Sequence, residues 1–195
     1  MKKLLLPLAI SLIVTNSQAA IIFLDLKGTA GLGLLPGNEP GSITGGTGGE
    51  IASTTGISYD TVTNVLDLTN VGWGSSQGFT DLSSLANNSH VHGPTANAEG
   101  NGFTQTAGVL LTLTRSSNAV TGGVFSSPVI DFDTAFGPSA ETREAQLLNG
   151  QLYINIHTAN NGGGEMRGFL VVPEPSTPLL GLVAFGSMFL RRRRA

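Results

Sequence analysis

The sequence predicts an all-β fold, an antiparallel Greek-key-like sandwich or small barrel with one short helix. Three observations support this class. Short apolar runs are separated by polar turns, 27 of the 195 residues are glycine, and a single segment has the features of a helix. Cysteine is absent, so disulfides and thiolate metal sites are excluded and a hydrophobic core must provide the stability. The length fits one domain with processing segments at its ends.

Strands are predicted where apolar residues form runs, or alternate with polar residues, between turn signals. The segment Val65 to Thr69 shows the alternation that is typical of a half-buried strand. The predicted strands span residues 21–27, 57–59, 65–69, 108–114, 120–125, 151–157 and 166–172. The glycine-rich residues 28–49 contain neither nucleotide-binding glycine motif, so we expect a surface loop there.

The one helix is predicted between Pro138 and Gly150. Ser139 is the expected N-cap, and glutamates in the early turns favour the helix start. Leu147 and Leu148 supply an apolar face, and Asn149 with Gly150 is expected to end the helix in a left-handed cap.

Residues 1–20 have the order of a secretory signal peptide. Two lysines precede an apolar run from Leu4 to Val14, and small residues follow up to Ala20. The run is shorter than the ~20 residues of a membrane-spanning helix. Cleavage is expected after Ala19 or Ala20. The sequence therefore predicts export through the Sec-type machinery and a mature domain over residues 21–172.

Residues 173–195 form a second processing segment. An apolar stretch, Leu179 to Leu190, would span about 18 Å as a helix, against a hydrocarbon core of about 30 Å. Such a helix contacts the membrane transiently, and the arginine cluster behind it favours the cytoplasmic side. The flanking residues are Pro173, Glu174 and Pro175 on one side and Arg191, Arg192, Arg193 and Arg194 on the other.

This order of Pro-Glu-Pro, apolar helix and arginine cluster closely resembles the PEP-CTERM sorting signal of bacteria. The resemblance implies recognition by an exosortase-type protease and delivery to the cell surface or the extracellular polysaccharide matrix. An uncleaved C-terminal anchor is the alternative interpretation.

The charge of the central region excludes one class of partner. Between residues 21 and 172, four basic residues stand against twelve acidic ones. Nucleic-acid binding depends on lysine and arginine neutralising phosphates, so no nucleic-acid partner is expected.

The three histidines are the main candidates for chemistry. His90 and His92 share one face of the chain if that segment is extended. In the strand at residues 151–157 the aliphatic side chains should face the core, which leaves Tyr153, Asn155 and His157 on the wetter face.

Together with Glu165, these histidines are compatible with a site for one zinc or copper ion, because neutral imidazole suits both metals. Asn155 or Tyr153 would then orient a ligand. The alternative is structural: the histidines bond the backbone at turns, and Glu165 forms a cross-strand ion pair with Arg167.

Three segments, His90 to Pro94, Leu147 to Thr158 and Gly163 to Gly168, carry a resemblance to the CHRD domain, a module of exported proteins. It is strongest from His90 to Leu170 and implies a β-rich fold and an extracellular structural or binding role, with polysaccharide or a surface protein as partner. The alternative is a metal-binding β-sandwich protein or metalloenzyme that uses the histidines.

Two further patterns are assigned no catalytic role. Ser76 lies in a Gly-x-Ser-x-Gly sequence, but no helix is predicted after it, so we expect a loop. Asp131 and Asp133 alternate with Ile130 and Phe132, which predicts a solvated strand face rather than a calcium or glycosidase site.

Overall fold

The computed structural model describes residues 21–28, 31–32, 51–53, 56–69, 71–78, 80–96 and 105–173. The expected cleavage residues Ala19 and Ala20 lie outside this part of the chain, as do Glu174, Pro175 and the arginines 191–194, while Pro173 is exposed. Within the described ranges, no helix is both long enough and apolar enough to cross a membrane.

The described elements are mostly short strands. They are β1 (Ile21–Gly28), β2 (Gly31–Leu32), β3 (Ile51–Ser53), β4 (Ile57–Asp60), β5 (Val65–Asp67), β6 (Val71–Trp73), β7 (Ala86–His92), β8 (Val109–Thr112), β9 (Gly123–Val124), β10 (Val129–Asp131), α1 (Phe132–Phe136), α2 (Ala140–Leu148), β11 (Tyr153–Thr158) and β12 (Met166–Val171). Single 3-10 turns occupy Ser75–Gln77 and Gly137–Ser139.

The strands form two antiparallel sheets. The large sheet has the order β10-β5-β4-β1-β12-β11-β7-β8, with β2 paired to β1. The small sheet has the order β3-β6-β9. Every pairing in both sheets is antiparallel, both between consecutive strands such as β4 and β5 and between distant ones such as β1 and β12, and this confirms an antiparallel all-β fold.

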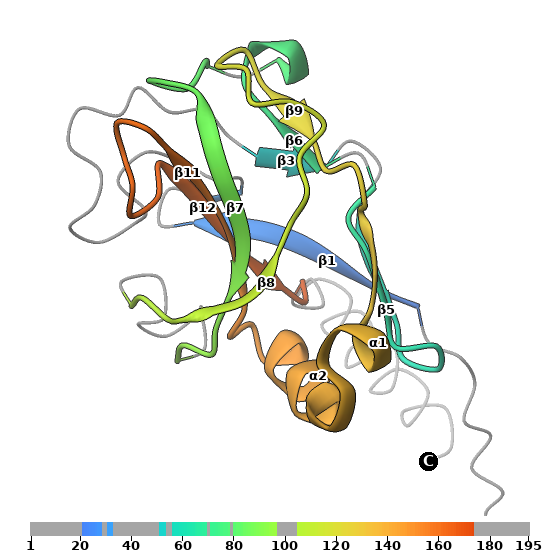
Figure 1. The fold of residues 1–195 in the computed structure, drawn as a ribbon. Coiled ribbons are helices and arrows are strands. Elements are labelled where there is room, and N and C mark those ends of the chain that lie inside the picture. The colour runs from blue at the N-terminus through green and yellow to red at the C-terminus, as the bar shows by residue number, and fades with distance from the viewer. Residues whose placement is uncertain are drawn as a thin grey trace, which may run out of the picture.

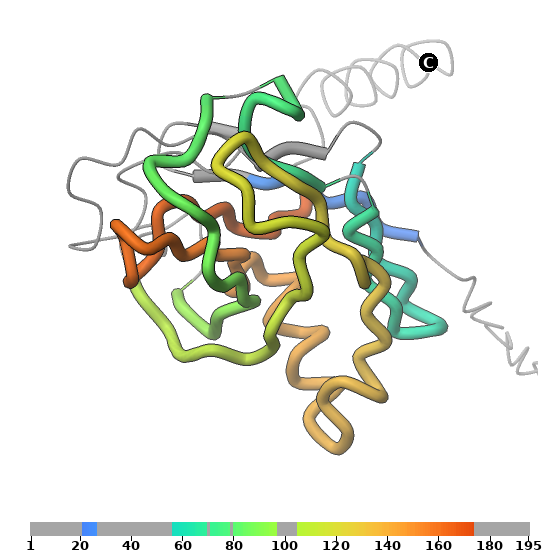
Figure 2. The backbone as a smooth tube through the Cα atoms, turned by 45° about the horizontal axis from the view of Figure 1, so that its top comes forward, coloured from blue at the N-terminus to red at the C-terminus, as the bar shows by residue number. Residues whose placement is uncertain are grey.

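The large sheet is curled into a half-barrel (Figure 1). The small sheet lies near one end of the curl, and α1 and α2 lie near the other. In the turned view the chain wraps around a common interior (Figure 2). That interior is one apolar cluster that includes Trp73, Leu147 and Ile154, each fully buried.

Most predicted strands are confirmed, although their ends differ. The segments at 21–27, 57–59, 65–69, 108–114, 151–157 and 166–172 match β1, β4, β5, β8, β11 and β12. The segment at 120–125 forms only the two residues of β9, because the chain first turns at residues 120–122.

The predicted helix is α2, but its start differs from the expectation. Ser139 makes no capping hydrogen bond, because the 3-10 turn Gly137–Ser139 leads directly into the helix. The C-terminal end is confirmed. Gly150 has a φ of 64°, its N–H donates to the carbonyl of Leu147, and the N–H of Gln151 donates to Gln146.

The prediction that Asp131 and Asp133 share one face of a strand is wrong, because only Asp131 belongs to a strand. The strand β10 ends at Asp131, and its carboxylate accepts hydrogen bonds from the backbone N–H groups of Asp133 and Thr134. This N-cap starts α1 at Phe132, so the two carboxylates belong to a cap and a helix rather than to one strand.

Candidate metal centre

The pairing of β7 with β11 brings the three histidines to one face of the sheet. His90 lies opposite Asn155, His92 lies opposite Tyr153, and His157 lies opposite Asn88. Residues directly opposite each other in an antiparallel pair project from the same face. The segment is extended as β7, a strand that the sequence analysis did not predict, so the condition for His90 and His92 to share one face is met, and His157 joins them from the neighbouring strand.

The imidazoles are close enough to share an ion. Nδ1 of His90 lies 3.0 Å from Nε2 of His157, and one nitrogen from each of the three rings falls within 4.8 Å of the others. Two nitrogens bound to one tetrahedral zinc ion, each at ~2 Å from the metal, are ~3.3 Å apart. A modest movement of the rings would therefore bring all three nitrogens to bonding distance.

Backbone carbonyls fix the tautomers of two of the rings. Nδ1 of His92 lies 2.9 Å from the carbonyl oxygen of Ala107, and Nδ1 of His157 lies 2.9 Å from that of Gly162. A carbonyl oxygen can only accept, so both Nδ1 atoms carry the hydrogen. In the neutral rings the lone pair is then on Nε2, the usual arrangement of a metal-binding histidine.

The Nε2 lone pairs of His157 and His92 have different surroundings. Nε2 of His157 accepts a hydrogen bond from Nδ1 of His90, because it has no hydrogen of its own to donate. Nε2 of His92 is buried and has no hydrogen-bond partner among the described residues. A buried polar atom without a partner costs about 1–3 kcal/mol, and such atoms are uncommon in native proteins.

Burial keeps the histidines in the neutral form that binds metal. Burial, followed by the positive charge that His157, His92 and Arg115 can carry, lowers the pKa of His90 to about 4. Burial also lowers the pKa of His92 and of His157, although the carbonyl bonds to Ala107 and Gly162 oppose the shift. All three rings are therefore neutral at pH 7.

The face that carries the histidines is less wet than the sequence analysis expected. Tyr153 and Asn155 are 1% and 0% exposed, and only His157 is half-buried. The reason is coverage by β12 and by the segment at residues 105–108. Arg167 and Phe169 lie opposite Asn155 and Tyr153, and Ala107 packs on the same small apolar cluster.

His92 is also held by a stack of rings. Its imidazole lies parallel to the ring of Tyr153, with centroids 5.0 Å apart, and the guanidinium of Arg167 lies 4.9 Å from the centroid of Tyr153. The hydroxyl of Tyr153 accepts from the N–H of Ala107, whose carbonyl accepts from His92. These contacts leave the His92 ring little freedom to rotate.

Glu165 is not brought to the histidines. Its side chain is fully buried, and its carboxylate accepts four hydrogen bonds, from the backbone N–H and hydroxyl of Ser83, the hydroxyl of Thr158 and the amide of Asn161. The three histidines form a ligand group without it. Glu165 therefore anchors the turn between β11 and β12.

That turn depends on one glycine. Gly164 has a φ of 127°, and a Cβ atom at this position would collide with the side-chain amide of Asn155. The close approach lets Asn155 donate to the carbonyl of Gly163 and sets the neighbouring Gly162 carbonyl beside His157. The turn thus helps to orient the His157 ring.

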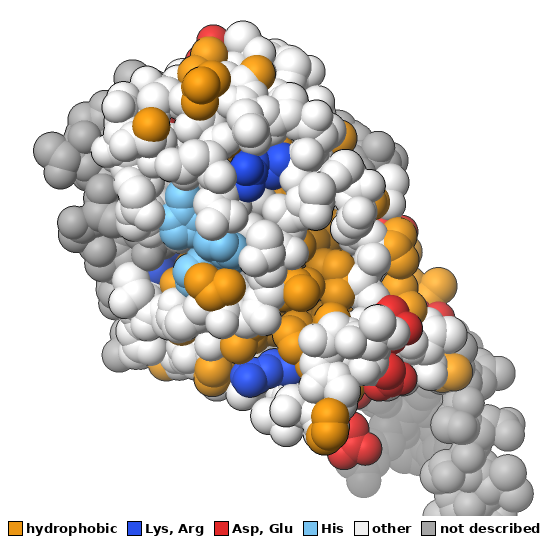
Figure 3. Space-filling view, viewed as in Figure 1, with side chains coloured by type: hydrophobic (Ala, Val, Ile, Leu, Met, Phe, Trp, Pro, Cys, Tyr) orange, Lys and Arg blue, Asp and Glu red, His pale blue; other side chains and the backbone are white. Residues whose placement is uncertain are grey.

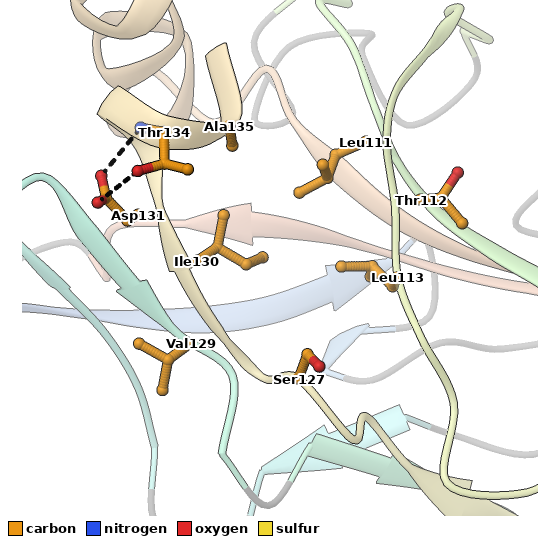
Figure 4. A pocket seen from close by; sticks show the side chains of 9 residues that line it. All are labelled: Leu111, Thr112, Leu113, Ser127, Val129, Ile130, Asp131, Thr134 and Ala135. Carbon is orange, nitrogen blue, oxygen red and sulfur yellow. Dashed lines mark hydrogen bonds between the residues drawn. The ribbon is translucent and has the colours of Figure 1, made fainter. Parts of the chain in front are cut away.

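An apolar groove of about 310 Å³ lies between the two edge strands of the large sheet (Figure 4). Its lining comes from β8, β10 and α1 and includes Leu111, Leu113 and Ile130. Its one acidic side chain is Asp131, which accepts hydrogen bonds from the Thr134 backbone and hydroxyl. None of the histidines lines this groove.

Ser76 has no catalytic surroundings in the structure. It is exposed in the 3-10 turn Ser75–Gln77, and its N–H donates to the carbonyl of Thr121. No α-helix follows it before β7, so the strand-turn-helix geometry of a nucleophile elbow is absent in this described stretch.

Nothing in the sequence indicates that the carbonyl groups of Ala107 and Gly162 or the cation of Arg115 lie near the histidines. A backbone carbonyl carries no side-chain signal, and Arg115 follows β8, which pairs with β7 only in the folded protein. The alternation of residues along β11 was the one available signal, and it found His157.

Fold and site together define a β-domain that carries three converging imidazoles on the outer face of a curled antiparallel sheet. The chain belongs to the CHRD domain family, whose model matches residues 34–170, more than half of the sequence. No curated protein and no solved structure matches the chain.

Proposed function

We propose that this CHRD domain binds one zinc or copper ion through His90, His92 and His157, and that it acts as an exported binding module. The observation that carries the proposal is the buried Nε2 of His92, which lacks a hydrogen-bond partner among the described residues and lies in a group of three imidazoles. A bound cation would be the partner for this lone pair.

The donor set favours these two metals. Neutral imidazole nitrogen suits zinc and copper, whereas magnesium and calcium prefer oxygen ligands. To bind a metal through Nδ1, the neutral ring of His90 must change tautomer, so that its hydrogen is on Nε2, because without metal Nδ1 donates to His157. The carbonyls of Ala107 and Gly162 already hold the other two rings in the required tautomer.

Metal content tests the proposal directly. Protein purified without a histidine tag and dialysed against zinc or copper should retain about one ion per chain. His92→Gln, His90→Gln and His157→Gln should each lose the ion, because each removes one of the three donors. The control is Asn87→Ala, an exposed position on the same strand, which should retain it.

The same experiment contains the result that would refute a shared site. Loss of metal from the His157 variant together with full retention in the His90 variant would contradict it. Circular dichroism of each variant separates loss of a ligand from loss of the fold. Retention of metal by all three folded variants would rule out the site altogether.

The proposed place of action is the cell surface or the extracellular matrix. Support comes from the sequence, in the signal-peptide order of residues 1–20 and the sorting-signal order of residues 173–195. The expected partners are the export machinery, an exosortase-type protease and a surface polysaccharide or protein. An uncut tail remaining as a membrane anchor is the second possibility.

Mass spectrometry of the protein recovered from its own cells tests the sorting proposal. The mature chain should begin after Ala19 or Ala20 and should lack Arg191 to Arg194. A membrane-bound chain that keeps the four arginines would favour the anchor. A full-length chain in the cytosol would contradict export.

A further inference from the structure

The described residues supply three nitrogen ligands to the proposed ion. A tetrahedral ion has four coordination positions, so one position is not filled by these residues. Among the described residues, one group of histidine or acidic side chains is placed to share a cation. It consists of His90, His92 and His157. Glu165, the carboxylate expected beside them, is held by Ser83, Thr158 and Asn161. Zinc sites with three protein ligands keep a fourth position for an exchangeable group.

The site is open to solvent on one side. The histidine side chains appear at the molecular surface, where they form one continuous patch (Figure 3). His157 is half-buried, and His90 and His92 are 9% and 7% exposed. An exogenous ligand of a few atoms can therefore approach the imidazoles without any rearrangement of the sheet.

A cationic side chain contacts the strand that carries His90 and His92. Arg115 donates to the hydroxyl of Ser89, the residue before His90, and to the side-chain oxygen of Asn118. These three bonds use three of the five N–H groups of a guanidinium. The guanidinium of Arg115 therefore lies beside β7, one residue along the strand from His90.

The acidic residues of the domain do not oppose this local charge. On the face that shows the histidines, the larger patches of aspartate and glutamate lie over α1 and α2, whereas lysine or arginine side chains border the histidines (Figure 3). The acidic patches visible on this face therefore lie away from the histidines.

We propose that the metal held by His90, His92 and His157 binds a carboxylate in its free coordination position, with Arg115 as the second anchor. This inference rests on the proposed metal site and adds the chemical class of its ligand. The carboxylate has two possible sources, a small free acid or the uronic acid of a polysaccharide. The shared chemistry is one oxygen on the metal and one on the guanidinium.

Azide binding to the copper(II)-loaded full-length protein is the primary test. Azide should produce a new ligand-to-copper charge-transfer absorption, and acetate should displace it. Arg115→Gln should weaken azide binding about fivefold, the effect of removing one partly exposed charge. Copper affinity should stay unchanged, and Arg115→Lys should restore part of the azide affinity.

Arg143→Gln is the matched control, because it removes the same charge from α2, where Arg143 bonds Gln146. Its azide affinity should equal that of the unchanged protein. Displacement of azide by acetate and by a uronic acid oligosaccharide, compared at equal carboxylate concentration, identifies the source of the carboxylate. Tighter competition by the oligosaccharide indicates a polymer ligand, and equal competition indicates a free acid.

The outcomes separate the two proposals. Failure of the protein to bind either copper or zinc overturns the metal site and this inference with it. Binding of copper without any spectral response to azide means a closed site, and it overturns the inference alone. An Arg115→Gln protein that binds azide as tightly as the Arg143→Gln protein would remove Arg115 from the ligand site.

Discussion

Two polar clusters that border β11 differ in how their acceptor atoms are satisfied. In the Glu165 cluster, which consists of Ser83, Thr158, Asn161 and Glu165, the carboxylate accepts four hydrogen bonds from the protein itself, although Oδ1 of Asn161 is buried without a partner among the described residues. In the histidine cluster, His90, His92 and His157, a buried lone pair has no donor among the described residues.

The difference separates a structural cluster from a binding site. A buried charge that is matched by donors of the protein stabilises one conformation and has nothing left to offer a ligand. In the histidine cluster Nε2 of His157 accepts from His90, but the buried Nε2 of His92 has no donor among the described residues, which is unfavourable until a cation arrives. The residue types alone do not distinguish the two clusters, because each cluster contains side chains that bind metals in other proteins.

The largest expected effect is the loss of stability on Glu165→Ala. The substitution leaves four donors of the cluster without their acceptor, so we expect a loss of about 4 kcal/mol in the free energy of unfolding, measured by urea denaturation. Glu141→Ala, at an exposed position of α2, should cost less than about 1 kcal/mol. Equal losses for both variants would show that the Glu165 cluster is not structural.

Zinc binding to the histidine cluster should increase the stability of the protein. At a free zinc concentration of 100 times the Kd, the free energy of unfolding should rise by about 2.7 kcal/mol. Glu165→Gln should show the same increment, because Glu165 lies outside the ligand group. His92→Gln should show almost none, and an equal increment in that variant would place the ion elsewhere.

Acid should weaken the metal-free protein through the histidines. Burial holds the pKa of all three rings below the ordinary value of 6.5, with His90 at about 4. The unfolded chain therefore takes up protons first, so stability is complete above pH 6.5 and falls as the pH decreases toward 4. His157 is half-buried, and solvent screening keeps this effect smaller than that of zinc.

Urea denaturation at pH 7.5, 6 and 5 measures this loss. Replacing His90 and His157 by glutamine should flatten the dependence. Asp60 and Asp131, whose hydrogen bonds lower the pKa of their carboxyl groups, act only below their ordinary value of 3.8 and do not confuse this range. A stability that stays constant from pH 7.5 to 5 would contradict burial of the imidazoles.

The fold was predictable where local pattern and tertiary packing agree. Alternation along β11 gave the correct faces, and Asn149 with Gly150 gave the correct end of α2. Prediction failed after Asp131. The alternation of apolar and acidic residues continues through Phe132 and predicted further strand, but β10 ends at Asp131. There the side chain of Asp131 caps the backbone, and the local hydrogen bonds favour a helix over further strand.

The candidate site was predictable in part for a related reason. Strand geometry predicts that His90 and His92 share a face and that His157 points away from the core, but the pairing of β7 with β11 that brings them together is seen only in the structure. The place of Glu165 does not follow from strand geometry, because its partner Ser83 is 82 residues away in sequence and meets it only in the folded chain. Burial of Tyr153 was also missed, since the covering segment around Ala107 is a loop without a pattern.

The smallest expected effect separates ring stacking from hydrogen bonding beside the histidine cluster. Tyr153→Phe keeps a ring against His92 but removes the acceptor of the Ala107 N–H, so the free energy of unfolding should fall by about 1 kcal/mol. Zinc affinity should stay within about threefold, because the carbonyl of Ala107 still holds His92. Tyr153→Leu, which also removes the ring, should weaken zinc binding further by freeing the imidazole to rotate. If zinc affinity falls equally in the two variants, the hydroxyl and not the stacked ring positions His92.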